Sequence, residues 1–370
     1  MNFDLTDEQR LLVDTVASFV KKQSPVSRLR GLREDSTGWS REVWQRMGEF
    51  GWIAVGLPES AGGLGGSFVD YALILEQLGT ALVPEPLLPA IVASSIVARL
   101  GTEEQQQRLL APVIAGEKSI AFAYAEAESR HDPVGPATRA EGNEITGEKR
   151  WVLNGHAAET LIVSAKSPKG ASVFAVAHDA PGVTIQPVKT MDGHHAAMIT
   201  FRQAQGELLG EEGGALAALE EALDIGAAAA CAEGAGLMRT VLDMTTDYLR
   251  TREQFGVKIG SFQALQHRAV DMFIETELCK SMMILAAIRA GDADASERKS
   301  AISAAKAQLA VGGKYVTQQA IQLHGGIGVT DEHDIGLYFK RMHILNSLFG
   351  DEEFHVTRFA DQPGFVGDLG

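Results

Sequence analysis

The segment R-E-Q-F-G-V-K-I-G-S-F-Q-A-L-Q-H-R, residues 252–268, decides how this chain is organised. It joins two long runs without proline, residues 219–249 and 264–290, whose apolar spacing predicts helices. Gly256 and Gly260 permit turns in the connector, which presents an arginine, an amide and an aromatic ring at one helix edge. Such a set suits a planar, anionic ligand. A helical corner with a capping arginine and a phenylalanine in the core fits the same residues.

Three further segments, taken with this one, resemble the acyl-CoA dehydrogenase family. They are G-W-I-A-V-G-L-P-E-S-A-G-G-L-G-G (51–66), G-E-K-R-W-V-L-N-G (147–155) and Q-L-H-G-G-I-G-V (322–329). The four motifs occur in the family's order over nearly the whole chain. The resemblance implies an α+β fold with an N-terminal α domain, a middle antiparallel β domain and a C-terminal four-helix-bundle α domain. It also implies FAD, bound between the bundle and the β domain.

The pattern along the chain predicts the same order of domains. Residues 1–118 are mainly helical, beginning with Thr6 and Gln9 as a capping box. Residues 119–210 contain alternating β-branched and aromatic runs separated by Gly, Pro, Asn and Asp, which predict antiparallel strands. Residues 211–370 are helical again, with a break at the glycines of the 322–329 motif.

Composition excludes several classes of function. A net charge of -15 argues against a nucleic-acid surface and against an anionic membrane. The N-terminus is acidic and polar, unlike a secretory signal, and we find no apolar run of the roughly 20 residues needed to span a bilayer. We expect a cytoplasmic protein without membrane insertion. Cys231 and Cys279 lie in apolar helical stretches without metal spacing, which predicts buried thiols and no metal site.

The resemblance assigns FAD contacts to specific residues. Arg252 would contact the pyrophosphate. Leu153 stands where the family usually has a hydroxyl residue that donates to flavin N5, and leucine cannot donate from its side chain. The other expected contacts are Gln254, Phe255 and Gln263 from the same subunit, Gln322, Gly325 and Gly326 from a neighbouring subunit, and Trp151 and Val152 beside the flavin ring.

At the catalytic base the sequence departs from the family pattern. In much of the family a glutamate near the C-terminus takes the α proton, but here L-F-G-D-E-E-F-H (348–355) puts Gly350 at that position. Some relatives carry the base on the helix before the 252–268 segment, at the position of Gly226. Glu233 lies seven residues later, nearly two helical turns, and so shares that helix face. We predict Glu233 as the base, with Asp351 and Glu352 of the adjacent acidic cluster or a structural role as alternatives.

Other departures from the family bear on the substrate. The run F-A-Y-A-E-A-E-S-R-H-D-P has Arg130 and His131 where the family usually shows Gly and Ser. Gly226 and the alanines after it would widen the acyl cavity, which favours a bulky or ring-bearing acyl group. We predict substrate contacts at Tyr124, Arg130, His131 and Gly226.

The resemblance therefore predicts an FAD-dependent acyl-CoA dehydrogenase. It would convert a bulky, branched or ring-bearing acyl-CoA to its trans-2-enoyl-CoA and pass electrons to electron-transfer flavoprotein. The pattern is most similar to the branch that serves steroid or bile-acid side chains, and the chain would form a homo-oligomer or a two-plus-two heterotetramer with a paralogous chain. One alternative is a non-catalytic partner subunit. Another is a flavin oxidase or monooxygenase on the same fold.

Overall fold

The computed structural model describes residues 4–129, 131, 133 and 137–363. The chain divides into two compact units whose segments alternate along the sequence. The first unit consists of Met1–Arg30, Phe68–Val83 and Ala227–Gly370, and the second of Gly31–Ser67 and Pro84–Gly226. The long helix α7 (Leu216–Thr251) begins in the second unit and continues into the first.

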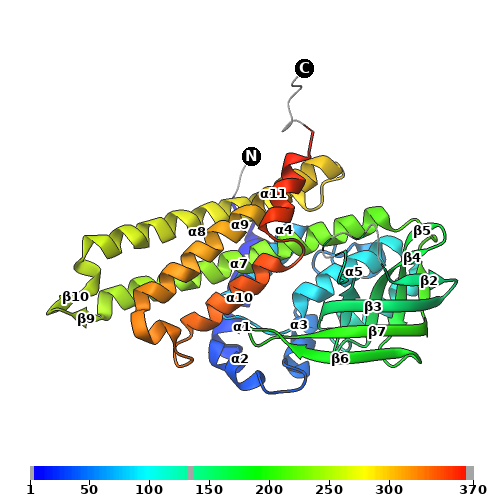
Figure 1. Ribbon diagram of the computed structural model, residues 1–370, viewed down its shortest axis with the longest axis horizontal. Helices are drawn as coiled ribbons and strands as arrows, with labels where there is room; N and C mark the ends of the chain where they lie inside the picture. Colours follow the sequence, from blue (N-terminus) through cyan, green and yellow to red (C-terminus); the bar gives the residue numbers. More distant parts are fainter. Residues whose placement is uncertain (1–3, 130, 132, 134–136, 364–370) are drawn as a thin grey trace. The chain divides into compact units, whose positions relative to one another are not determined.

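The first unit is helical. Thr6 and Gln9 form the expected capping box at the start of α1, which confirms that prediction. Figure 1 shows α8 and α9 running side by side along most of their length. Its helices are α1 (Asp7–Gln23), α2 (Val26–Leu32), α4 (Phe68–Gly79), α8 (Gln263–Arg289), α9 (Ala295–His324), η3 (Gly325–Val329), α10 (Ile335–Ser347) and α11 (Glu352–Ala360), with η2 (Ile259–Ser261) before α8.

Small residues in α7 allow its backbone to meet that of α4. A Cβ atom on Gly236 would lie 1.8 Å from the carbonyl oxygen of Glu76, and one on Gly79 would lie 2.2 Å from the carbonyl oxygen of Glu233. Side chains at these two glycines would force the helices apart. The apolar run around Glu233 is therefore built for close helix packing.

Helix α7 is also long and apolar enough, by length and composition alone, to cross a bilayer. From the sequence we expected no apolar run long enough to span a bilayer. However, 83% of its most apolar 18-residue window is buried inside the protein, as in a core helix of a helical bundle. Cys231 in this helix and Cys279 in α8 are buried and free, as predicted, and burial raises the pKa of both thiols to about 12.

The second unit combines helices with one large sheet. Its strand order is β6-β7-β3-β2-β4-β5-β8, with β1 also paired to β4 (Figure 1). Its helices are α3 (Arg41–Glu49), η1 (Glu59–Ala61), α5 (Leu87–Leu100) and α6 (Glu103–Ile114). Its strands are β1 (Ile120–Ala123), β2 (Arg139–Glu141), β3 (Glu144–Leu153), β4 (Thr160–Ser167), β5 (Gly170–Ala177), β6 (Val183–Lys189), β7 (His195–Gln205) and β8 (Glu207–Leu209).

Most strand pairs of the middle β domain are antiparallel, as expected, but two pairs are parallel. Strands β1 and β2 both pair with β4 in parallel, while the other pairs are antiparallel. The chain passes through β2 and β3 before it returns beside β1, so β4 meets β1 in the same direction. Alternation of apolar residues reveals a strand but not the direction of its neighbour.

Candidate active site

A tight hairpin follows α7 in the first unit, where the sequence predicts flavin contacts. Strands β9 (Glu253–Gln254) and β10 (Val257–Lys258) are joined by Phe255 and Gly256, which have φ angles of 56° and 76°. Two left-handed residues are typical of a type I′ turn, which favours Asn and Gly and rarely contains a bulky residue. Phe255 is nevertheless at this tip and 92% exposed. Such strain is common at ligand sites, where the structure holds a side chain in place for binding.

The polar residues of this segment are available on the same surface. Arg252 is exposed, and among the described residues none accepts a hydrogen bond from its guanidinium group. Its backbone is fixed, because its N–H donates to the carbonyl of Tyr248 at 2.9 Å and its carbonyl accepts from the N–H of Ile259 at 2.9 Å. Gln254 and Gln263 are also exposed. A guanidinium group on a rigid backbone and without an acidic partner is well suited to a phosphate.

The second predicted flavin segment ends α9 in the same unit. Gln322, Gly325 and Gly326 are exposed, and a Cβ atom on either glycine would meet no atom within 4 Å. The backbone there is therefore open to a ligand. The ring of His324 stacks on Tyr248 of α7 with ring centroids 4.5 Å apart, which joins the C-terminal ends of α7 and α9.

The third predicted flavin segment lies at the end of β3 in the second unit. The pairing of β3 with β7 shifts register between Lys149 and Val152, and this bulge gives Trp151 a φ of 54° and leaves it 56% exposed. Val152 points the opposite way, into the core of the β domain. The side chain of Val152 thus packs inside the protein, so that only its backbone can lie beside a bound ring. Leu153 is half-buried.

The predicted base, Glu233, is buried and ion-paired with Arg341 of α10. One edge of the guanidinium group makes both bonds: Nε donates to Oε1 at 2.6 Å and Nη2 donates to Oε2 at 2.9 Å. A bidentate arginine pair stabilises the carboxylate and occupies both of its oxygens. To accept a substrate proton, Glu233 would first have to release Arg341.

The alternative carboxylates follow Gly350 at the start of α11. The side chain of Asp351 caps this helix by accepting from the N–H of Phe354 at 3.0 Å, whereas Glu352 is exposed. The loop before them is held by buried Lys306, whose Nζ donates to the carbonyls of Leu345, Asn346 and Gly350 at 2.7, 3.2 and 3.0 Å. Burial lowers the pKa of Lys306 to about 8.

The predicted substrate contacts are placed in the second unit. Tyr124 is half-buried and stacks on Phe122 with ring centroids 5.1 Å apart. His131 is half-buried, and Arg130 lies outside the described residues. Gly226 is buried within α7. Among the described residues, no group of three or more His, Cys, Asp or Glu side chains is arranged to hold a metal ion.

Known proteins are similar to this chain over all of these segments. Three family models match successive parts of the chain: the acyl-CoA dehydrogenase N-terminal domain over residues 6–117, the middle domain over 121–204 and the C-terminal domain over 212–362. The chain belongs to the acyl-CoA dehydrogenase family. It is therefore an oxidoreductase of a family whose cofactor is FAD, and the three-domain fold expected from the resemblance is confirmed.

Individual relatives cover almost the full length of the chain. The probable acyl-CoA dehydrogenase YngJ of Bacillus subtilis is 33% identical over 383 residues, covering 98% of this chain and 99% of the relative. A solved Tcur3481–Tcur3483 steroid ACAD variant has a TM-score of 0.88 and 30% identity, with 96% and 97% of the two chains covered. A chain of the ChsE4–ChsE5 complex from Mycobacterium tuberculosis has a TM-score of 0.88 and 26% identity, with 97% and 98% covered.

The residues predicted to bind FAD in this acyl-CoA dehydrogenase fit that cofactor. Arg252 offers a cation without an acidic partner, the backbone at Gly325 and Gly326 is uncovered, and Phe255 and Trp151 expose aromatic rings from left-handed backbone. A phosphate group binds to a cation and to uncovered backbone N–H groups. A flat ring system packs against exposed aromatic rings.

Three residues with clear structural roles at these segments were not predicted from the sequence. Arg341 pairs with the predicted base, Lys306 holds the loop at Gly350, and Asn154 follows the Trp151–Leu153 segment in a left-handed conformation with φ 58°. Only Asn154 carried a local signal, because an Asn-Gly dipeptide indicates a turn. The partners of Arg341 and Lys306 are far away in the sequence.

The pKa values of two histidines in the second unit indicate that the protein loses stability in acid. His156 and His195 lie with ring centroids 5.3 Å apart, and burial lowers the pKa of both. The charge of His178 lowers the pKa of His156 further, whereas the hydrogen bond to Thr37 raises it. The charges of His156, Lys189 and His194 lower the pKa of His195 further, whereas the charge of Asp35 raises it. The unfolded chain therefore takes up protons near pH 6.5 while the folded chain does not.

We expect the free energy of unfolding to fall as the pH drops below 6.5, by at most about 1.4 kcal/mol per pH unit for each histidine. His156→Gln and His195→Gln should each flatten this dependence in urea unfolding at pH 7.5 and 5.5. His267→Gln, at an exposed position, is the matched control and should leave it unchanged. An unaltered slope in both test variants would contradict the assignment.

Proposed function

We propose that this chain catalyses the FAD-dependent α,β-dehydrogenation of a ring-bearing acyl-CoA to its trans-2-enoyl-CoA and passes electrons to electron-transfer flavoprotein. The observation that carries the proposal is the exposed, strained pair of aromatic residues, Phe255 and Trp151, one in each unit and each next to a predicted flavin segment. Strained backbone of this kind clusters at ligand sites, where a bound ligand uses the side chain.

Each predicted residue has a chemical task in this reaction. FAD, when bound, supplies the acceptor for the hydride that leaves the β carbon. Arg252 binds the pyrophosphate, and Gln322 with the backbone at Gly325 and Gly326 binds the FAD of a neighbouring subunit. A carboxylate takes the α proton, for which Glu233 remains the prediction, with Asp351 and Glu352 as alternatives.

Support for a ring-bearing substrate comes from the 30% identical relative whose title names a steroid ACAD. The small residues after Gly226 add less support than expected. Ala227 and Ala230 are fully buried in the chain itself. A steroid side-chain thioester is the substrate class that we propose.

Assembly with further chains is supported by helix α8. Several large apolar side chains of this helix are between 39% and 54% exposed and follow one another at helical spacing, so that they form a continuous stripe: Val270, Phe273, Ile274, Leu278, Leu285 and Ile288. Contiguous exposed apolar surface of this kind indicates a protein interface. We propose that the stripe packs against another copy or a paralogous chain.

The second candidate is a partner subunit that lacks its own base. Two observations favour it: Arg341 occupies both oxygens of Glu233, and Gly350 has no room for a side chain, since a Cβ atom there would lie 2.4 Å from Nε2 of His355. Two solved relatives carry two-component names, Tcur3481–Tcur3483 and ChsE4–ChsE5. In this case a second chain would supply the base.

The visible spectrum of the chain purified alone separates these functions. We expect a flavin band that is bleached anaerobically by ring-bearing acyl-CoA and much less by butyryl- or octanoyl-CoA. A flavin band that no acyl-CoA bleaches would favour the partner subunit. Turnover with oxygen in the absence of electron-transfer flavoprotein would favour an oxidase or monooxygenase, and a colourless protein would contradict a complete FAD site.

Arg252→Met provides the internal test of the cofactor site. A charge-assisted hydrogen bond is worth about 1.5–3 kcal/mol, so we expect FAD to bind roughly 10- to 150-fold more weakly without a change in melting temperature. Arg250→Met is the matched control, because Arg250 is equally exposed but pairs with Asp247 at 3.4 Å. Equal FAD affinity in both variants would contradict the pyrophosphate contact.

A further inference from the structure

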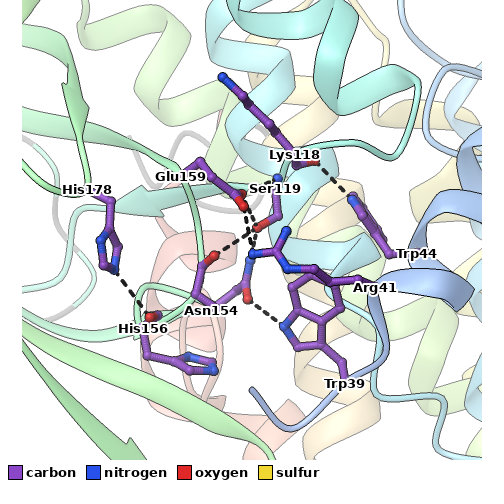
Figure 2. Close-up of polar contacts among 10 residues, drawn as sticks. Trp39, Arg41, Trp44, Lys118, Ser119, Asn154, His156, Glu159 and His178 are labelled. Carbon is purple, nitrogen blue, oxygen red and sulfur yellow. Dashed lines mark hydrogen bonds and ion pairs between the residues drawn. The ribbon is translucent and has the colours of Figure 1, made fainter. Parts of the chain in front are cut away.

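A closed ring of polar contacts surrounds the end of β3 in the second unit, as Figure 2 shows. The Trp39 indole N–H donates to Oδ1 of Asn154 at 3.0 Å, and Nδ2 of Asn154 donates to Oγ of Ser119 at 3.2 Å. Ser119 donates to Oε2 of Glu159 through its backbone N–H at 2.7 Å and its hydroxyl at 3.2 Å. Arg41 closes the ring: it pairs with Oε1 of Glu159 at 2.7 Å and lies 5.5 Å from the Trp39 ring centroid.

Asn154 is the member of this ring that belongs to the flavin segment. It directly follows Trp151–Leu153, is only 4% exposed and adopts φ 58°. Its carbonyl accepts from the N–H groups of Ala157 and Ala158 at 3.1 and 2.9 Å, which turns the chain sharply after the strand. Asparagine tolerates the left-handed region better than most residues, but its buried amide requires the partners that Trp39 and Ser119 provide.

The other end of the segment is fixed independently. Lys149 is buried, and its Nζ donates to Oε1 of Glu126 at 2.6 Å, to Oγ of Ser164 at 3.1 Å and to the carbonyl of Tyr124 at 3.1 Å. The N–H of Arg150 donates to the carbonyl of Ala125 at 2.8 Å. The bulge at Trp151 is thus held between a buried ion pair on one side and the ring at Asn154 on the other.

We propose that Asn154 is a positioning residue for the flavin ring, and that Trp39 and Ser119 hold it in place. The inference rests on the proposed role of Trp151–Leu153 beside that ring. Because the Trp151 side chain is 56% exposed, its direction depends on the backbone at both ends of the bulge. Loss of the Asn154 amide releases one end while the Lys149 anchor keeps the strand folded.

The decisive variants remove the hydrogen bonds while keeping a backbone that tolerates φ 58° in one case and an aromatic side chain in the other. Asn154→Gly tolerates φ 58° but has no amide, and Trp39→Phe keeps an aromatic ring but has no N–H. Asn154→Gly removes two hydrogen bonds and Trp39→Phe removes one, so we expect amide exchange in residues 150–155 to accelerate roughly tenfold in Asn154→Gly and about threefold in Trp39→Phe. The bound flavin should show a shifted absorption maximum and reduction potential in both.

Gln203→Gly is the matched control, because Gln203 is an exposed residue of β7 with a left-handed φ of 51° and takes no part in the ring. It should change neither the exchange of residues 150–155 nor the flavin spectrum. Unchanged exchange in Asn154→Gly, or faster exchange with an unaltered flavin spectrum and potential, would overturn the proposal. A wild-type protein without FAD would instead contradict the proposed function, and the exchange measurement would still decide whether Asn154 holds the segment.

Discussion

Arg341→Met is expected to lower the free energy of unfolding by about 3–5 kcal/mol, because it leaves the Glu233 carboxylate buried without its partner. The two side chains share two hydrogen bonds of 2.6 and 2.9 Å, and both residues are less than a tenth exposed. Breaking one side of such a pair is far more costly than removing both. Chemical denaturation of the purified variant measures the loss directly.

The double variant Glu233→Leu with Arg341→Met should recover most of that stability, since two apolar side chains leave no unpaired charge. Arg239→Met is the matched control: Arg239 pairs with Asp243 on the surface, with both side chains 59% exposed, and such a pair is worth about 0–1 kcal/mol. If Arg341→Met is no more destabilising than Arg239→Met, the buried pair does not support the bundle.

Glu233→Gln separates the structural role of this ion pair from a role in proton transfer. If Glu233 takes the α proton, FAD stays bound in this variant but substrate no longer bleaches it, whereas Asp351→Asn and Glu352→Gln retain most of the bleaching. Bleaching at the wild-type rate in Glu233→Gln would mean that Glu233 acts only through its ion pair with Arg341. Opening that pair during turnover would make Arg341 part of the mechanism.

Local chemistry in the sequence was enough to predict many parts of the fold. The capping box formed by Thr6 and Gln9 depends on residues three apart. The parallel pairing of β1 with β4 depends instead on how the chain returns across the sheet, which no local pattern contains. Resemblance, rather than periodicity, identified the three-domain fold.

The candidate site was predictable as a set of segments but not as a set of side-chain directions. No local pattern indicates that Val152 points into the core while Trp151 points outward, because a bulge reverses the usual alternation of a strand. The partner of Glu233 is 108 residues away, on another helix. A lone acid among alanines therefore indicated a functional base as readily as a buried ion pair.

Gly350→Ala is expected to destabilise the protein by about 2–6 kcal/mol, for two separate reasons. Gly350 has φ 120°, where an L side chain is strained by about 1–3 kcal/mol. The new Cβ atom would also lie 2.4 Å from Nε2 of buried His355 and 2.5 Å from Cδ1 of Phe354, and overpacking of this kind costs about 1–3 kcal/mol. Denaturant unfolding of the single variant measures the sum of the backbone strain and the steric cost.

A double-mutant cycle with His355→Ala separates these two costs. Removing the imidazole relieves the clash with His355 but neither the clash with Phe354 nor the backbone strain, so the two changes should couple by about 1 kcal/mol. Gly291→Ala is the control, because Gly291 has open space around it and should change stability by less than about 0.5 kcal/mol. A Gly350→Ala cost as small as this control would mean that the loop adapts freely. In that case a glutamate at position 350 could act as a base, whereas a large cost means that the loop held by Lys306 excludes one.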